Sequence, residues 1–424
     1  MIFAVVLTLT AIIFATIAWR DLRLAISLTL FALPSYLIRF EVGPLPMTLL
    51  EVLVLIVIVR FVIAVIMKKQ TVEYKGWFVW PIIIFLLAAT IGVVVAPDKL
   101  AALGIWRAYF VEPILFFFVV RSTLKNTQHV NGALKALGCS AVVVSVLGLL
   151  QWITNIGIPA PWDFERRIVS VFDFPNAVGL YLGPIVTIAL ITLFEKIKNQ
   201  YTKSQTNLKH QNKKTDIAFW LAVAILGGLT IIAAKTEAAY AAIPASLLIV
   251  SFFHRRARRY TIPLAAIGLV AAMMITPVRQ KLTLHDYSGE VRRTQWTETL
   301  AMLKDHPLFG AGLSGYPTVF APYHHAEWVE VFQYPHNIIL NIWSELGLLG
   351  LLAFLLLAVH VLRSSPLLTK EGTGVVLVVL AALLEMTIHG LVDVPYFKND
   401  LALMTWTLLA LLTISAGLDR SAQK

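Results

Sequence analysis

The sequence predicts an all-α, polytopic integral membrane protein with about 12–13 transmembrane helices. Hydrophobic residues make up 58% of its 424 positions and charged residues only 14%. Soluble chains contain roughly 45–50% and 25% of these classes. The formal charge of +11 is carried mainly by short segments between apolar runs, which is a signal of membrane topology. We therefore expect contact with membrane lipids and no nucleic-acid partner.

Apolar runs long enough to span a bilayer, or slightly shorter, follow one another along the chain. They lie near residues 3–19, 22–38, 48–66, 78–95, 103–120, 132–152, 174–194, 216–233, 238–253, 261–277, 337–361, 373–392 and 400–417. The second run is the weakest, because Pro34 interrupts it and Pro44 and Pro46 follow. A re-entrant segment is the alternative there.

Lysine and arginine are concentrated in alternate loops, which the positive-inside rule assigns to the cytoplasm. We divide the chain into N-terminal transmembrane helices (1–160), middle transmembrane helices (161–277), a large outward loop (278–335) and C-terminal transmembrane helices (336–424). The middle part contains a lysine-rich segment, 196–214, which we expect to be a cytoplasmic loop. The large outward loop is the only sizeable polar piece.

Within the outward loop the sequence predicts an amphipathic helix suited to the membrane surface. Ser288 is a good helix cap, and Trp296, Leu300 and Leu303 recur at helical spacing. The helix should end before Pro307, because proline disrupts the interior of a helix. A glycine-rich turn follows it.

The strongest candidate for a reactive group is His336. Proline is favourable at the first helical position, so Pro335 predicts the start of a helix with His336 at its N-terminal mouth. Free backbone N–H groups and the helix dipole favour an anion there. Asn337, Asn341 and Glu345 follow, and such polar groups are costly in a bilayer unless they meet a partner or a cavity.

Arg292 and Arg293 are candidates for binding a phosphate group. Guanidinium offers paired donors and stays charged, so it suits a diphosphate. The alternative is an exposed helix face or contact with anionic lipid headgroups.

Two further pairs admit structural explanations. His389 and Asp393 stand four residues apart at the outward end of a span, where they form a hydrogen-bonded pair or belong to the same site. Lys235 and Glu237 lie between two spans, and a local ion pair is the simplest explanation for them.

The sequence favours no metal site and no cofactor. His324 and His325, with His285 and Glu327, lack the ligand spacing of a metal-binding helix. The single cysteine, Cys139, lies in an apolar run.

Residues 288–357 resemble the signature region of the O-antigen ligase and O-antigen polymerase superfamily, bacterial membrane glycosyltransferases that use polyprenyl-diphosphate-linked glycans. The resemblance rests on an arginine shortly before a tryptophan, a His-Pro-Leu-Phe-Gly-Ala-Gly segment, a His-Asn pair and a Glu-Leu-Gly step. These are Arg292 and Trp296, residues 306–312, His336 with Asn337, and residues 345–347.

Two other pieces agree with this pattern, and one departs from it. Arg167 followed by Pro175 and Asn176 resembles the arginine and Pro-Asn element of a middle span, and residues 389–393 resemble the late His and Asp element. Where the family often has Ser-Arg-Gly or Ser-Arg-Ala, this chain has Thr-Glu-Ala at 236–238. We hypothesise that Lys235 replaces the missing arginine.

The resemblance implies an enzyme that transfers a glycan from a polyprenyl diphosphate, such as undecaprenyl diphosphate, to an acceptor hydroxyl without a metal. His336 would be the general base, because histidine ordinarily titrates near neutral pH. Arg292, Arg293, Lys235, Arg167 and Asn337 would contact the diphosphate or glycan. The expected supporting residues are Asn176, Glu345, His389 and Asp393.

Several reactions fit this resemblance. We favour a ligase acting on lipid A core or another surface acceptor in lipopolysaccharide biosynthesis, and next a surface-polysaccharide polymerase. A protein O-oligosaccharyltransferase is a third alternative. The implied location is the bacterial cytoplasmic membrane, with the site facing the periplasm. A transporter or flippase of lipid-linked glycan is the alternative from another class, although the sequence has no clear internal repeat.

Overall fold

The structure, a computed structural model, describes residues 2–43, 45–202, 210–253, 255–326, 328, 330–364 and 374–422. Within this part, eight helices are long and apolar enough to cross a membrane, and four shorter apolar helices accompany them. The long helices are α1 (Ile2–Arg20), α3 (Leu49–Ile66), α5 (Lys99–Ile105) continued through a π-helical turn (Trp106–Val111) into α6 (Glu112–Thr123), α7 (Thr127–Thr154), α8 (Pro175–Thr202), α9 (His210–Ala233), α15 (Ile338–Ser364) and α17 (Asn399–Ala422). The shorter ones are α2 (Leu22–Phe31), α4 (Val79–Val95), α10 (Glu237–Phe253) and α16 (Gly374–His389). The predicted all-α, multi-pass membrane fold is confirmed.

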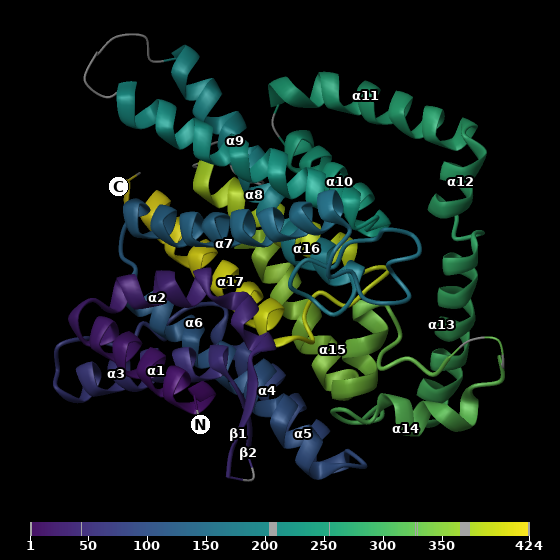
Figure 1. Ribbon diagram of the computed structural model, residues 1–424, viewed down its shortest axis with the longest axis horizontal. Coiled ribbons are helices and arrows are strands. Elements are labelled where there is room, and N and C mark those ends of the chain that lie inside the picture. Colours follow the sequence, from purple (N-terminus) through teal and green to yellow (C-terminus); the bar gives the residue numbers. More distant parts are fainter. Residues whose placement is uncertain are drawn as a thin grey trace.

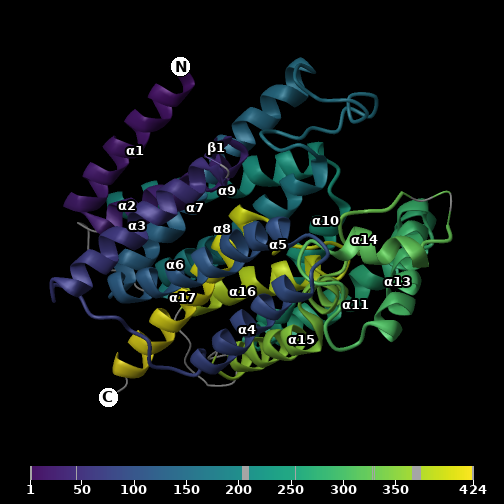
Figure 2. The ribbon, with the colours of Figure 1, turned by 90° about the horizontal axis from the view of Figure 1, so that it is seen from below.

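The apolar helices pack against one another, and the segment between α10 and α15 runs along one edge of them (Figures 1 and 2). α8 packs against α9 and α16, α4 packs against α15, and α6 packs against α17. The edge segment contains α11 (Arg255–Met274), α12 (Thr276–Leu282), α13 (Tyr287–Asp305), α14 (Tyr316–Phe320) and a 3₁₀ turn (Ala321–Tyr323). α13 contacts α15, so the edge segment meets the membrane helices near His336.

Two predicted spans differ from the structure. The run near 261–277 forms α11 and the start of α12 in the edge segment, and neither helix is among the described helices that are long and apolar enough to cross a membrane. The second predicted span is interrupted. α2 ends at Phe31, a 3₁₀ turn (Leu33–Leu37) contains Pro34, and an antiparallel hairpin follows. Its strands are β1 (Arg39–Val42) and β2 (Leu45–Thr48), and Arg39 pairs with Thr48. A proline in the run shortens the helix. β1 alternates polar and apolar residues, but a pattern of four residues is too short to predict a strand, and Pro46 lies within β2.

The lysine-rich segment also differs from its prediction as a loop. Helix α8 continues to Thr202 and α9 begins at His210, so both ends of 196–214 are helical. Lys196 lies 2.8 Å from the carboxylate of Asp216 in an ion pair. Residues 203–209 lie outside the described part of the chain.

Helix α13 forms where the sequence predicts a helix, but its cap and buried face are different. Asp286, not Ser288, caps it by accepting the N–H of Gly289 at 3.1 Å. The helix ends at Asp305, before the proline, as predicted. Leu303 is buried, whereas Leu300 is 44% exposed. The buried face is mixed, because it also contains the polar side chains of Gln295 and Thr299.

The glycine-rich segment after α13 packs closely against a break in α15. At that break Gly347 has φ 67° and ψ −170°, a conformation that is essentially restricted to glycine. The backbone N–H of Ala311 donates to the carbonyl of Ser344 at 2.6 Å. A Cβ added to Gly310 would lie 2.2 Å from the same carbonyl oxygen. These glycines allow the two backbones to approach.

We predict that Gly347→Ala destabilises the protein by about 1–3 kcal/mol, because the strained backbone is unfavourable for any side chain. Its Cβ would also lie 2.2 Å from the carbonyl oxygen of Leu308. Thermal unfolding in detergent measures the change. Gly228→Ala in α9 is the control, since no atom lies within 4 Å of its added Cβ. Equal melting temperatures for the two variants would contradict the prediction.

Candidate functional site

The candidate site is organised around the turn formed by residues 390–393, which follows α16. Three consecutive backbone carbonyl groups in this turn each accept a hydrogen bond from another part of the chain. The donors are the backbone N–H of Ile338, the side-chain amide of Asn337 and the Nε of Arg292, at 2.7, 2.9 and 2.9 Å from the oxygens of Gly390, Leu391 and Val392. The turn thereby joins α13, the start of α15 and the end of α16.

The next residue of the turn, Asp393, faces His336. Its Oδ1 lies 3.5 Å from the Nδ1 of His336, and the two side chains are 3% and 18% exposed. The rings of Phe332 and Tyr334 pack edge-on against the imidazole, with centroids 4.9 and 4.8 Å away. A carboxylate therefore lies beside one nitrogen of the imidazole, at a distance too long for a hydrogen bond within the described residues, and aromatic rings pack around the imidazole.

Asn337, not Pro335, begins α15. The side-chain oxygen of Asn337 accepts the N–H groups of Ile339 and Leu340 at 3.0 and 3.1 Å, and the first helical residue is Ile338. The prediction that Pro335 opens the helix is therefore wrong. His336 precedes the cap with a φ of 46°, in the left-handed region that favours turns.

The first N–H groups of α15 all have partners within the protein. Ile338 donates to the 390–393 turn, the next two N–H groups bind the side chain of Asn337, and Asn341 donates to the carbonyl of Asn337 at 2.8 Å. The predicted row of free N–H groups is absent from this helix start. The helix dipole still favours negative charge here.

The pKa of Asp393 lies below its ordinary value of 3.8. Burial alone would raise this pKa, but interactions with His336, the charge of His389 and the backbone N–H of Val394 outweigh burial. The carboxylate is consequently ionised at neutral pH and can fix the orientation of the imidazole.

His389 and Asp393 do not form the predicted pair. α16 ends at His389, and the Nδ1 of His389 lies 3.2 Å from the carboxylate of Glu385, one turn earlier in the same helix. Glu385 is fully buried against Gly183 of α8. Glu385 was not predicted as a site residue, although an acidic residue inside an apolar span and four residues before a histidine is a usable signal.

The two adjacent arginines have different surroundings. Arg292 is half-buried and binds the 390–393 turn through Nε and the Ser288 backbone carbonyl and hydroxyl through one terminal nitrogen. Its other terminal nitrogen has no hydrogen bond within the described residues. Arg293 is exposed on the other side of α13. Only Arg292 is directed toward the turn that carries Asp393.

Helix α13 also fixes the backbone that leads to His336. The indole N–H of Trp296 donates to the carbonyl of Pro335 at 2.8 Å, and the amide of Gln295 donates to the carbonyl of Tyr334 at 2.9 Å. Gln295 was not predicted as a site residue. The sequence around Gln295 does not predict this role, because the contact depends on where the backbone near Tyr334 lies in the fold.

Glu345 supports the glycine-rich segment. Its carboxylate accepts the backbone N–H of Ser314 at 2.6 Å, and the side chain is 4% exposed. This satisfies the expectation that a charge within a span has a partner. Asn341, by contrast, is 1% exposed and has no side-chain hydrogen bond within the described residues.

Three other predicted residues form a second polar group. Arg167 lies 3.3 Å from the side-chain oxygen of Asn176 and donates to the carbonyl groups of Ala234 and Lys235 at 3.3 and 3.5 Å. The ammonium of Lys235 donates to the carbonyl of Glu165 at 2.8 Å. The structure therefore brings Arg167, Asn176 and Lys235 together, and among the described residues none of the three has a hydrogen bond or ion pair with His336 or Arg292.

The predicted ion pair between Lys235 and Glu237 does not form. Glu237 pairs instead with Lys281 of α12. Lys235 has a φ of 52°, and this turn sends its side chain toward the segment before α8.

A further cation, Lys398, was not among the predicted site residues. It follows the 390–393 turn by five residues, and its ammonium lies 5.1, 5.0 and 5.2 Å from the ring centroids of Tyr36, Phe172 and Phe174. Phe174 is two residues from Asn176 of the second polar group. Asp400, at the start of α17, also interacts with this ammonium electrostatically. No spacing or motif in the sequence links Lys398 to these rings, because they lie far away in the chain.

His324 and His325, which follow α14, both contact Glu298 of α13. Glu298 accepts the backbone N–H groups of His325 and Ala326 at 2.9 and 3.1 Å and lies 2.9 Å from the Nδ1 of His324. Among the described residues, no group of three potential ligands is close enough to hold a metal ion. Glu327 lies outside those residues.

These features define a multi-pass membrane protein in which His336 lies beside the carboxylate of Asp393, with Arg292 close by. The three residues lie where the edge segment meets the membrane helices. Residues 222–355 match the family model described as O-Antigen ligase, a range that includes His336, Arg292 and Glu345. This match, over about a third of the chain, supports the O-antigen ligase and polymerase superfamily, whose members are enzymes of the membrane glycosyltransferase type. No curated protein matches the chain.

We predict that ionised Asp393 stabilises the fold at neutral pH and that acid removes this contribution. Because its folded pKa is lowered, the contribution is complete above the ordinary value of 3.8 and is lost as the pH falls through the lowered pKa. The difference in melting temperature between the wild type and Asp393→Asn should shrink below about pH 4. A difference that grows in acid would contradict this sign.

Proposed function

We propose that the protein transfers a glycan from a polyprenyl diphosphate carrier to an acceptor hydroxyl at the outward face of the bacterial cytoplasmic membrane. The ligase reaction, with a lipid or another surface acceptor, is the form that we favour. A polymerase would use the same site with a second lipid-linked glycan as the acceptor. The match of residues 222–355 to the O-Antigen ligase family model and the positive-inside pattern support this proposal.

The observation that carries the proposal is the contact between His336 and Asp393. A carboxylate beside Nδ1 favours a proton on that nitrogen and leaves Nε2 as the acceptor. In the proposed reaction the acceptor oxygen attacks the anomeric carbon, the bond to the diphosphate oxygen breaks and Nε2 takes the hydroxyl proton. Polyprenyl diphosphate leaves as an anion and needs no proton.

Cations beside the pair would stabilise the departing diphosphate. Arg292 is the first candidate, because its Nε is bound to the same turn as Asp393 while one terminal nitrogen stays unpaired within the described residues. A charge that is already oriented stabilises negative charge in the transition state without further rearrangement. We assign Arg293 no direct contact, since it is exposed on the other side of α13.

The second polar group would bind the donor farther from the reacting atoms. Arg167 donates to the backbone carbonyls of Ala234 and Lys235, just before the 236–238 step where the family pattern often has an arginine, and Lys235 binds the carbonyl of Glu165. Lys398 is a third cation near this group. We propose that these residues bind the second phosphate or the first sugars, with Asn176 orienting Arg167.

The test of the proposal is transfer by the purified protein in nanodiscs. The protein is incubated with a polyprenyl-diphosphate-linked oligosaccharide, with and without a lipid A core acceptor, and the products are identified by mass spectrometry. We predict that His336→Ala lowers the transfer rate by at least about 100-fold, as expected for loss of a general base. Unchanged transfer by a correctly inserted His336→Ala protein would contradict the role of His336.

The two arginines provide a matched comparison. We predict that Arg292→Ala raises KM for the donor by about tenfold or more, because it removes a charged contact to the diphosphate. Arg293→Ala should leave KM within about twofold, since surface charges contribute little. Equal losses in both variants would contradict the assignment of Arg292.

A further inference from the structure

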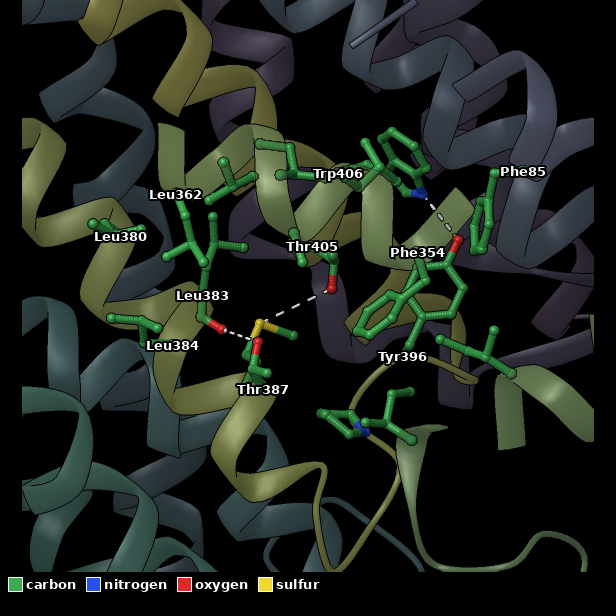
Figure 3. Close-up of a pocket in the computed structure, with 18 residues that line it drawn as sticks. Phe85, Phe354, Leu362, Leu380, Leu383, Leu384, Thr387, Tyr396, Thr405 and Trp406 are labelled. Carbon is green, nitrogen blue, oxygen red and sulfur yellow. Dashed lines mark hydrogen bonds between the residues drawn. The ribbon is translucent and has the colours of Figure 1, made fainter. Parts of the chain in front are cut away.

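The loop of residues 155–174, which joins α7 to α8, exposes large apolar side chains beyond the end of α7 (Figure 1). Phe164 is 93% exposed and Ile156 is 74% exposed. Exposed apolar side chains are expected on helices that cross a membrane, such as Leu362 of α15, which lines the apolar pocket in Figure 3. The loop lies outside any such helix, so its exposed apolar side chains need another explanation.

The loop is held in one conformation by the last turn of α7. The side-chain amide of Gln151 donates to the carbonyl groups of Gly157 and Ser170 at 3.1 and 2.8 Å. The side-chain oxygen of Gln151 accepts the backbone N–H of Ser170 at 2.7 Å. Arg166 donates to the carbonyl of Trp152 at 3.0 Å. The exposure of the apolar side chains is therefore a property of a folded loop.

Two membrane helices expose apolar faces that end beside this loop. The large exposed residues in the second half of α7 are Val143, Val146, Leu147, Leu150, Trp152 and Ile153, and those of α9 are Leu221, Ile225, Leu229 and Ile232. Most of them recur every three or four residues, which places them on one face of each helix. Both helices are long and apolar enough to cross a membrane, and the loop reaches the end of α9, where the N–H of Ile168 donates to the carbonyl of Ala233 at 3.4 Å. The apolar side chains of the loop thus continue a surface that faces lipid.

We propose that Phe164 and Ile156 insert into the lipid leaflet at this end of the helices and anchor the loop to the membrane. Trp152, in the last turn of α7, is 49% exposed, and tryptophan is enriched at the membrane–water interface. Asp163 and Glu165 flank Phe164 and are exposed, and their charges are costly in hydrocarbon. The insertion is therefore shallow, like that of interfacial helices, which bury their apolar face by about 5–10 Å.

The anchor sets the height of the second polar group relative to the bilayer. The loop contains Arg167, and the carbonyl of Glu165 in the same loop accepts the ammonium of Lys235 at 2.8 Å. Phosphate groups of a lipid lie at the level of the headgroups, so a shallow anchor holds these cations where a lipid-linked diphosphate would be. This consequence rests on the proposed function, whereas the insertion of Phe164 does not.

The test is the accessibility of a spin label in the full-length protein, reconstituted in nanodiscs of phosphatidylethanolamine and phosphatidylglycerol. The single cysteine is first removed by Cys139→Ser, and the label is attached through Phe164→Cys. Glu165→Cys is the matched control, because the adjacent residue is also exposed but is polar. Oxygen concentrates in the bilayer and a nickel chelate stays in water. The ratio of oxygen to nickel accessibility should be at least about threefold higher at position 164 than at 165, as expected for an inserted side chain.

The outcomes separate lipid from the other possible occupants of this surface. Equal ratios at the two positions would overturn the anchor, because the label at position 164 would then lie in water. A label at position 164 that is shielded from both reagents would also overturn it, since a second copy of the chain would then cover the loop. The measurement uses no glycan donor or acceptor. Its result therefore stands whether or not the protein transfers glycan.

Discussion

The arrangement of the site depends on how the backbone carbonyl groups of the 390–393 turn are paired. Buried carbonyl groups need hydrogen-bond donors, and a segment between membrane helices has few of them. Here the donors come from the residue before α15, the first residue of α15 and Arg292 of α13. The same hydrogen bonds that satisfy the turn bring Asp393 to His336. The hydrogen bonds that stabilise the turn therefore also determine the geometry of the site.

Three other ionisable groups within the helices, Glu385, Glu345 and Arg107, have structural partners and stand apart from this pair. Glu385 binds His389 within α16, and Glu345 binds the glycine-rich segment. Near the opposite end of the chain, Arg107 pairs with Glu51 and Glu112 at 2.7 and 3.3 Å. Charged groups are costly in a bilayer, which explains why these side chains are paired. Asp393 differs because its partner is a partly exposed histidine.

The sequence predicted the parts of the molecule that follow from local pattern. Apolar length located nearly every membrane helix, and the family pattern selected His336, Arg292 and Asp393. It could not predict that Asp393 would meet His336 instead of His389, because that depends on where α16 ends and how the next turn folds. The contacts of Gln295 and Lys398 could not be predicted either, since each of these side chains meets segments that are distant in the chain. Proline at 335 misled the prediction because Asn337 is the stronger cap.

Glycine positions explain how two irregular segments pack so closely. The break at Gly347 divides α15 and admits the segment after α13, whose own glycines lie against the break. Glu345 then binds that segment through its backbone. The position of α13, and with it Arg292, consequently depends on a break within a membrane helix. The Glu-Leu-Gly step of the family pattern thus has a structural explanation in this chain.

The central claim is that His336 and Asp393 act as one unit in glycan transfer. A double-mutant cycle with His336→Ala, Asp393→Asn and the combined variant, using one donor and one acceptor, tests it most directly. If the two residues act together, the combined variant transfers glycan no more slowly than His336→Ala alone. Losses that multiply in the combined variant would show that the two residues act independently and would contradict the account.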